Sequence, residues 1–300
     1  MNLQEFLAKV HNYEIRIRRA VNGSMHGNFR SVFKGSGLEF ADVREYQYGD
    51  DLRLIDWNTT AKGHGTYVKI FKEEKEQTVF FMVDVSASQQ VGSSERSKLA
   101  TTKEICAVLS LSAIQEASHV GLYCFSDRKE RYIKPSNSIK HGYQIIVELF
   151  KLKPESLKTD LSKAIVFALD ILRRKSVVIL ISDFIDAGYE HHLKALARKH
   201  DLVVVHLYDQ RETNLPRMGI VPVYDTESRR TVWMNTSSNR FRNFVRGIFQ
   251  NNRQTLEQLC KEYKANYIAI NSTEDYVPKL IKLFKFRNLR SNAIAEPEAN

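Results

Sequence analysis

The chain has 300 residues, 43% of them hydrophobic and 27% charged, a globular composition that excludes disorder over most of its length. The formal net charge is +10, and the surplus is concentrated in residues 211–300, which contain 15 basic and 9 acidic residues. Three cysteines (Cys106, Cys124 and Cys260) are scattered along the chain. Their spacing fits neither a disulfide framework nor a zinc site.

The amino terminus lacks the basic and apolar regions of a signal peptide. No apolar run approaches the roughly 18 residues that a membrane span needs. From these two absences we expect a soluble, cytoplasmic protein.

The first 77 residues are expected to form an amino-terminal extension. Residues 3–20 have a partly helical apolar spacing, residues 21–40 are rich in Gly, Ser and Asn and are typical of a loop, and residues 66–72 alternate as a strand does. Between the loop and the strand lies a dense Arg/Asp-rich run.

From residue 78 the pattern changes to continuous apolar runs separated by helical segments, which is typical of strands buried on both faces. We predict an α/β domain at 78–290 with a doubly wound, mostly parallel six-stranded sheet, a β-hairpin insertion near 213–236 and a flexible tail at 291–300. The strands are expected at 78–83, 119–125, 131–134, 176–182, 202–208 and 266–270, and the helices at 97–118, 143–152, 160–173, 191–200, 239–263 and 276–286.

Polar side chains follow the predicted strands at the carboxyl edge of this sheet, where such folds bind ligands. Asp84, Ser86 and Ser88 follow the first core strand, Thr159 precedes a helix, and Asp183 follows the strand at 176–182. Two carboxylates and three hydroxyls suit a hard divalent ion, Mg²⁺ or Mn²⁺. The plain alternative is that these residues only form turns and helix caps.

Asp-x-Ser-x-Ser, a later Thr and an Asp after a Val-rich strand resemble the metal-ion-dependent adhesion site of von Willebrand factor A domains. The resemblance implies that Asp84, Ser86, Ser88, Thr159 and Asp183 hold the metal, and that a partner's carboxylate completes its coordination. The metal would then bridge two proteins rather than catalyse a reaction. Lys158 stands where that family usually has a Gly before the Thr.

The Arg/Asp-rich run at 44–57 contains seven candidate residues for a recognition surface or for a structural clasp. In the clasp, Arg holds a carboxylate bidentately, Gly49 permits the turn, and Trp57 anchors the segment to the core. We favour the clasp over a recognition surface or a second metal site. The seven residues are Arg44, Tyr46, Asp50, Asp51, Arg53, Asp56 and Trp57.

Residues 30–235 also resemble the bacterial proteins called domain of unknown function 58. The resemblance is carried by Gly-x-Glu-Phe at 37–40, Gly-Asp-Asp-x-Arg-x-Ile-Asp-Trp at 49–57, and Asp209-x-x-Glu212-x-x-Leu-Pro. It implies a von Willebrand factor A-like core and a MoxR-type AAA+ ATPase, or its client, as partner. Many relatives carry amino-terminal membrane helices, whereas this chain shows none.

Two other function classes remain open. A metal-dependent phosphoester hydrolase would use the same oxygens, but no general base or second metal site is evident, and the Gly-x-Ser-x-Gly and Walker motifs are absent. A nucleic-acid binder would use the basic carboxyl-terminal third, where Arg240, Arg242, Arg246 and Arg253 precede Lys279, Lys282, Lys285, Arg287 and Arg290. We favour a solvated helix face there. A third use of these residues is docking on an acidic partner or on anionic lipid, which is a peripheral membrane contact. We interpret the histidines as surface or helix-cap groups.

Overall fold

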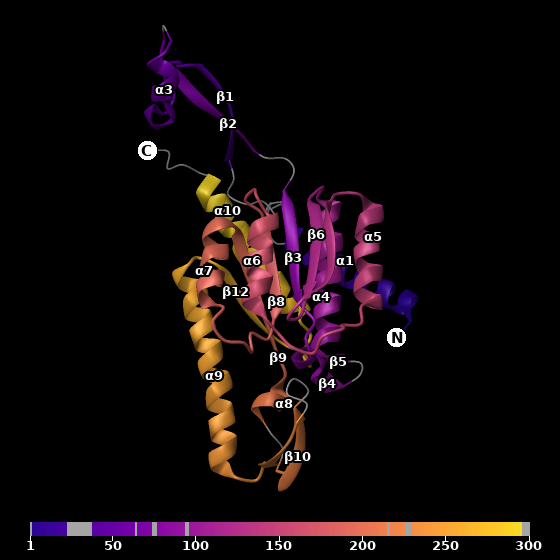
Figure 1. Ribbon diagram of the computed structural model, residues 1–300. Helices are drawn as coiled ribbons and strands as arrows, with labels where there is room; N and C mark the ends of the chain where they lie inside the picture. Colours follow the sequence, from indigo (N-terminus) through magenta and orange to yellow (C-terminus); the bar gives the residue numbers. More distant parts are fainter. Residues whose placement is uncertain are drawn as a thin grey trace.

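The computed structural model describes residues 2–22, 38–63, 65–73, 77–93, 96–214, 217–225 and 230–295. Figure 1 shows a central sheet between two layers of helices. Most of the loop predicted at 21–40, the predicted hairpin turn and the last five residues of the tail lie outside the described residues.

The central sheet has six strands, in the order β12-β9-β8-β3-β6-β7. If these six strands are renumbered 1 to 6 in chain order and read from the β7 edge, the order is 3-2-1-4-5-6. This is the order of a doubly wound fold. All neighbours are parallel except β6 and β7. The predicted doubly wound, mostly parallel six-stranded sheet is therefore confirmed. The strands are β3 (Thr78–Asp84), β6 (His119–Phe125), β7 (Lys129–Ser136), β8 (Val177–Ser182), β9 (Asp201–Tyr208) and β12 (Asn266–Asn271).

Two hydrophobic clusters cover the two faces of the sheet, because each inner strand is apolar on both sides. One face is covered by α1 (Leu3–Asn22), α4 (Lys98–Gln115), α5 (Ile139–Lys151) and α10 (Val277–Ala295). The other face is covered by α6 (Leu161–Ile171), α7 (Glu190–Lys199) and α9 (Asn239–Glu262). Serine or aspartate side chains cap α4, α5, α6 and α9 at their amino ends.

Helix α1 belongs to this core. Phe6, Val10 and Ile17 are almost fully buried in the first hydrophobic cluster, and α1 packs against α4 and α10. The Nζ atom of Lys9 lies 2.6 Å from a carboxylate oxygen of Glu104 on α4. The apolar spacing of residues 3–20 therefore serves the same core as the sheet.

The Arg/Asp-rich run lies in a separate small unit. Strand β1 (Leu38–Glu45) pairs antiparallel with β2 (Tyr67–Glu73), and the short helices η1 (Leu52–Leu54) and α3 (Trp57–Thr60) lie between them. We predicted β2 but not β1, because the charged residues of 42–45 mask its alternation. In Figure 1 this unit stands beyond the amino-terminal edge of the sheet.

A second extension, which we call the arm, lies beyond the carboxyl edge of the sheet (Figure 1). It consists of α8 (Gln210–Thr213), the antiparallel hairpin of β10 (Ile220–Asp225) and β11 (Arg230–Asn235), and the first half of α9. Helix α9 has 24 residues, which corresponds to about 36 Å. The short elements η2 (Ala87–Gln90), β4 (Gly92–Ser93) and β5 (Arg96–Ser97) lie at the same edge of the sheet.

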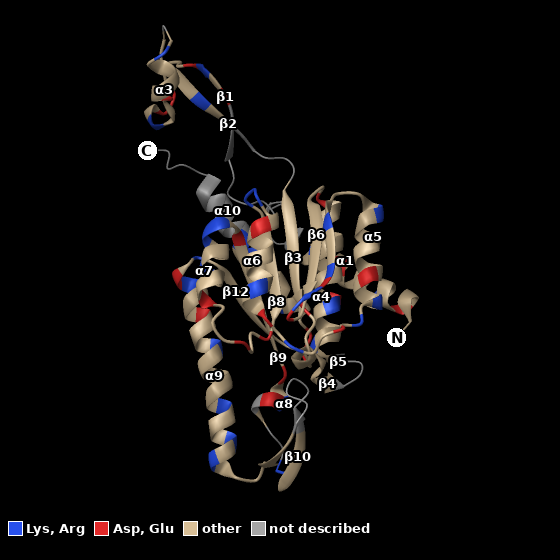
Figure 2. Ribbon diagram, in the orientation of Figure 1, with Lys and Arg blue, Asp and Glu red and all other residues tan. Residues whose placement is uncertain are grey.

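Basic residues recur along α9 (Figure 2), and three of its arginines, Arg240, Arg242 and Arg246, lie in the half that belongs to the arm. The basic residues of α10 are different, and the predicted solvated face is wrong for Arg287. This side chain is 8% exposed and binds both carboxylate oxygens of Asp201, at 3.1 and 2.6 Å. In the part of the chain that the structure describes, no helix is long and apolar enough to cross a membrane.

Candidate functional site

Asp84, the last residue of β3, is the centre of the candidate site. Strand β3 lies next to β8 where the strand order reverses, which is where doubly wound sheets bind ligands. Its carboxylate is fully buried. The backbone N–H of Ser86 donates to Oδ1 at 2.9 Å, and the hydroxyl of Ser182 donates to Oδ2 at 2.6 Å.

The chain turns immediately after Asp84, as the spacing requires. The hydroxyls of Ser86 and Ser88 lie 3.1 Å apart, so the alternate positions of Asp-x-Ser-x-Ser face one another. Burial raises the pKa of Asp84 to about 6, and the nearby charge of Asp183 adds to the rise. The two predicted carboxylates therefore share one electrostatic environment.

A buried lysine lies at this site, and the sequence did not point to it. Lys98, the first residue of α4, is 0% exposed, and its Nζ donates to Asp183 and to Glu212, at 2.6 Å each. Burial lowers the pKa of Lys98, but the charges of Asp183 and Glu212 outweigh that effect and raise it overall. Lys98 is therefore a permanent cation bound between two carboxylates.

Glu212 connects this cation to the base of the arm. In α8, the Asp209 side chain caps the helix, and the second oxygen of Glu212 accepts a hydrogen bond from the Asp209 N–H at 3.0 Å. The hydroxyl of Ser272, just after β12, donates to Asp209 at 2.8 Å. The loops after β8, β9 and β12 are thus joined through buried polar groups.

Thr159 lies in a loop that reaches the same edge. The backbone N–H of Ala87 donates to the carbonyl of Leu157 at 3.0 Å, which joins this loop to the turn after Asp84. No hydrogen bond joins Thr159 to Asp84 or Asp183. Its hydroxyl oxygen is buried without a partner among the described residues, and so are both polar atoms of the Gln89 side chain, which is 0% exposed.

The chemistry of these groups fits a divalent cation. With all three carboxyl groups ionised, Asp84, Asp183 and Glu212 give a formal charge of −3 against the one positive charge of Lys98, which leaves −2. Burial raises the pKa of Asp84 and of Glu212, as expected where excess negative charge lacks a counter-ion. Buried polar atoms without partners are unusual, and an ion or an ordered water would satisfy them. The described residues contain no cluster of three or more His, Cys, Asp and Glu side chains that could hold a metal. The candidate set differs from such a cluster because it consists of two carboxylates and three hydroxyls.

Four of the groups at this edge were missed from sequence. Ser182 and Gln89 adjoin predicted site residues, so their neighbours could have pointed to them. Glu212 lies in a motif that resembled a family, without a role attached to it. Lys98 gave no signal, because a lysine at the start of a helix is usually solvated.

The run at 44–57 forms surface ion pairs. Both terminal nitrogens of Arg44 donate to Asp50, at 2.7 and 2.6 Å, and Nε of Arg53 lies 3.1 Å from each oxygen of Asp51. Asp56 caps α3, and Gly49 has a positive φ of 106°. This geometry agrees with the clasp. Tyr46 follows β1, and its N–H donates to the carbonyl of Thr66 at 2.7 Å.

One part of the clasp hypothesis is wrong, because Trp57 does not anchor the segment. Its side chain is 69% exposed, and Tyr48 and Leu52 are exposed as well. Among the side chains of this unit that the structure describes, Ile55 and Val68 are buried, and an isolated antiparallel bridge joins them. The small unit therefore presents aromatic side chains to solvent.

The interpretation of the histidines is also wrong in one case. His206 lies inside β9, is 5% exposed, and its Nδ1 lies 2.8 Å from the hydroxyl of Tyr267. Burial lowers its pKa to about 4, so the ring is neutral at pH 7.

A family model described as "Protein of unknown function DUF58" matches residues 42–255. The chain belongs to this family. The match includes both the Arg/Asp-rich run and the carboxyl-edge cluster, and it ends within α9 of the arm.

Relatives in mycobacteria are similar over most of their length. Uncharacterized protein Rv1480 of Mycobacterium tuberculosis and uncharacterized protein Mb1516 of Mycobacterium bovis are each 25% identical over 224 residues, which is 74% of this chain and 71% of theirs.

Solved structures with a similar fold include BatB of Bacteroides thetaiotaomicron, with a TM-score of 0.45 and 12% identity over 70% of this chain and 98% of that one. An aerotolerance-related membrane protein of Bacteroides fragilis gives a TM-score of 0.48 and 15% identity over 71% and 99%. The SpRpn10 VWA domain gives a TM-score of 0.40 and 9% identity over 68% and 93%.

Proposed function

We propose that this protein is a metal-dependent protein-interaction module that binds its partner through the carboxyl edge of the sheet. The observation that supports this most is the buried Asp84–Ser86–Ser88 turn, which lies in the field of Asp183 and belongs to a cluster with a residual charge of −2.

In this proposal Asp84, Ser86, Ser88, Thr159 and Asp183 hold Mg²⁺ or Mn²⁺ directly or through water. These are hard oxygen donors, and Mg²⁺ usually keeps several waters when bound to one or two carboxylates. When bound, the ion supplies an open position that a carboxylate of the partner completes. Lys98 already holds Oδ2 of Asp183, and the Ile185 N–H donates to Oδ1 at 3.3 Å. The remaining lone pair of Oδ1 is therefore the one that would meet a ligand in this scheme.

The partner we propose is a MoxR-type AAA+ ATPase or one of its client proteins, and the role is that of an adaptor in protein maturation or complex assembly. The family resemblance of the chain supports this choice. We propose no catalytic residue. Among the described residues of this edge, the hydroxyls of Ser86 and Ser88 hydrogen-bond each other and no histidine.

The direct test is a thermal unfolding titration of the full chain with MgCl₂ and MnCl₂, at constant ionic strength. A ligand that binds only the folded state raises its apparent stability, by about 2.7 kcal/mol at 100 times its dissociation constant. We expect a saturable rise of the midpoint for the wild type and none for Asp84→Asn, which keeps the shape of the side chain.

Asp170→Asn is a matched control, because Asp170 is an exposed residue of α6 away from the sheet edge. This variant must keep the full metal response. Equal responses in the wild type and Asp84→Asn, or no response in either, would rule out the metal site at Asp84.

The partner is tested by affinity purification from the native cytoplasm with Mg²⁺ present. An AAA+ ATPase should be recovered with the wild type and lost with Asp84→Asn or with EDTA. Recovery that is unchanged by both treatments would mean that the partner binds elsewhere. Turnover of a model phosphodiester that depends on Asp84 would favour the hydrolase instead.

A further inference from the structure

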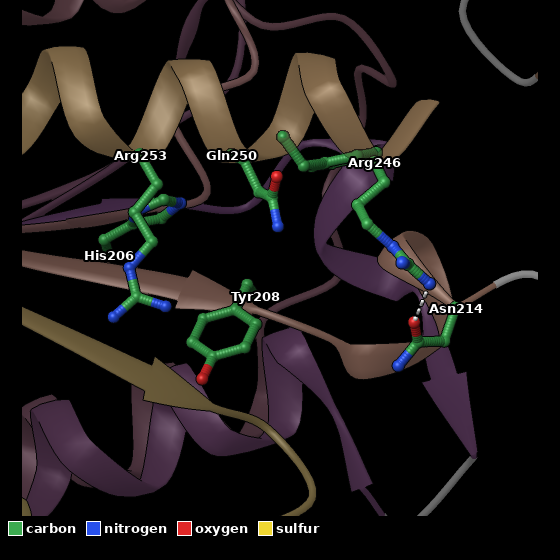
Figure 3. Close-up of a pocket in the computed structure, with 7 residues that line it drawn as sticks. His206, Tyr208, Asn214, Arg246, Gln250 and Arg253 are labelled. Carbon is green, nitrogen blue, oxygen red and sulfur yellow. Dashed lines mark hydrogen bonds between the residues drawn. The ribbon is translucent and has the colours of Figure 1, made fainter. Parts of the chain in front are cut away.

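A pocket of about 420 Å³ lies between the carboxyl end of β9 and the helix α9 of the arm. Its volume is within the range of ligand sites, about 300–1,000 Å³. His206 and Tyr208 form one wall from β9, Asn214 follows α8, and Arg246, Gln250 and Arg253 project from α9 (Figure 3). None of the metal-site candidates lines it.

The pocket has two guanidinium groups and no lining carboxylate. Among the described residues, Arg246 donates to the amide oxygen of Asn214, at 3.1 Å. Arg253 lies over the ring of Tyr208, 5.5 Å from its centroid, and its side chain hydrogen-bonds that of Tyr267. Neither arginine has an ion-pair partner among the described residues. A guanidinium has five N–H donors in a planar fork that fits carboxylate and phosphate, so most of these donors face the pocket or solvent.

The spacing of the two arginines favours a ligand with two separated anionic groups. They are seven residues apart on α9, which is two turns and about 10 Å along the helix. In Figure 3 their guanidinium groups point to opposite ends of the pocket, with Gln250 between them. A single phosphate or carboxylate would leave one of them unpaired.

The groups between the arginines suit a peptide backbone. The side-chain amide of Gln250 has both a donor and an acceptor, as a peptide group has, and it forms no hydrogen bond with the described residues. Tyr208 presents an aromatic face beside it (Figure 3). His206 adds no charge, because it is buried and neutral.

We propose that this pocket binds an acidic peptide segment, with Arg246 and Arg253 each holding a carboxylate side chain and Gln250 contacting the backbone between them. Such binding needs no metal, so it is separate from the function proposed for the carboxyl edge. The site adjoins that edge through β9, which supplies His206 and Tyr208 to the pocket and is followed by Asp209 at the edge.

The test measures fluorescence anisotropy of a labelled hexaglutamate peptide with the full chain, in EDTA and at low salt. We expect saturable binding that is weakened about tenfold or more by Arg246→Gln/Arg253→Gln, since each tenfold loss corresponds to about 1.4 kcal/mol. Asp84→Asn must bind as the wild type does, which separates this site from the metal site. The thermal unfolding midpoint of each variant is measured first, and a variant is used only if its midpoint equals that of the wild type.

The control is Arg240→Gln/Lys261→Gln, which removes the same charge from exposed positions of α9 outside the pocket. It should bind hexaglutamate within about twofold of the wild type. An equal loss of hexaglutamate affinity in both double variants would show that binding depends only on the net charge of α9. That result would overturn the proposal. Inorganic phosphate or oligothymidylate that binds through the same two arginines, while hexaglutamate does not, would overturn it in favour of phosphate or nucleic acid.

Discussion

Acidic and basic side chains meet in two regions of this molecule, at opposite ends of the sheet in Figure 1. At the carboxyl edge, Lys98 is bound between Asp183 and Glu212 with almost no solvent contact. In the small unit beyond the other edge, Arg44–Asp50 and Arg53–Asp51 have similar distances, 2.6 and 2.9 Å, but are more open to water. Distance alone does not distinguish them.

Burial is the difference, and it changes what each pair contributes. A buried charge that loses its partner has neither water nor a counter-ion, whereas an exposed charge is solvated again at once. The buried cluster is therefore intolerant of single changes. Substitutions in the exposed pairs should change the free energy of unfolding little. Any function of these pairs would therefore depend on a binding partner.

The largest expected effect is that of Lys98→Met, which breaks the buried cluster. The methionine fills a similar volume but leaves Asp183 and Glu212 buried without their cation. Removal of one partner from a buried pair costs about 3–5 kcal/mol, and we expect a loss of that size in the free energy of unfolding, measured by urea denaturation at pH 7.5.

Lys103→Met is the control for this change. Lys103 lies on the same helix, α4, and its Nζ donates to the backbone carbonyl of Leu152 at 2.9 Å. It holds no carboxylate, so we expect a loss of only about 1 kcal/mol, the value of an ordinary hydrogen bond. If the two variants were equally stable, burial would not separate the two regions, and the comparison would fail.

A smaller effect is expected within one segment, where a buried and an exposed histidine can be compared. His200 follows α7, is 3% exposed, and accepts a hydrogen bond from the Ser176 N–H at Nδ1, at 3.3 Å. Burial lowers its pKa from 6.5 to about 4. Between these values the unfolded chain binds the proton and the folded chain does not, so stability falls as the pH is lowered from 6.5 to 4.

In His200→Gln this contribution to acid sensitivity is removed. Between pH 7.5 and pH 4, we expect the free energy of unfolding to fall by about 2 kcal/mol less in the variant than in the wild type, after allowance for solvent screening. The measurement is urea denaturation across that range. His191→Gln, an exposed residue of α7, should follow the wild-type profile, and an equally shallow profile there would contradict the assignment to His200.

The fold was predictable because its signal is periodic and local. The runs at 78–83 and 176–182 have no place but the interior of a sheet, and their polar ends predicted where Asp84 and Asp183 lie. Lys98 and Glu212 were not predictable, since their meeting depends on how α4 and α8 pack at one edge, 114 residues apart. The position of Trp57 also depends on tertiary packing. Its size predicts burial, but the four-residue helix α3 that carries it has no buried residue, and the side chain is exposed.

The smallest effect is expected in the exposed region, where Arg44→Gln and Asp50→Asn test the other side of the comparison. Asp50 also accepts a hydrogen bond from the Gln47 N–H at 2.8 Å, and the side-chain hydrogen bond from Arg44 lowers its pKa. Both groups are nevertheless open to solvent, and salt screens such pairs. We expect each variant to unfold at the wild-type midpoint within error at 0.15 M salt, and the double variant to show no coupling beyond the sum of the two. A midpoint that falls in Arg44→Gln as far as in Lys98→Met would show that the small unit is an essential part of the fold. With stability unchanged, a loss of partner recovery in Arg44→Gln would instead assign this exposed surface to recognition.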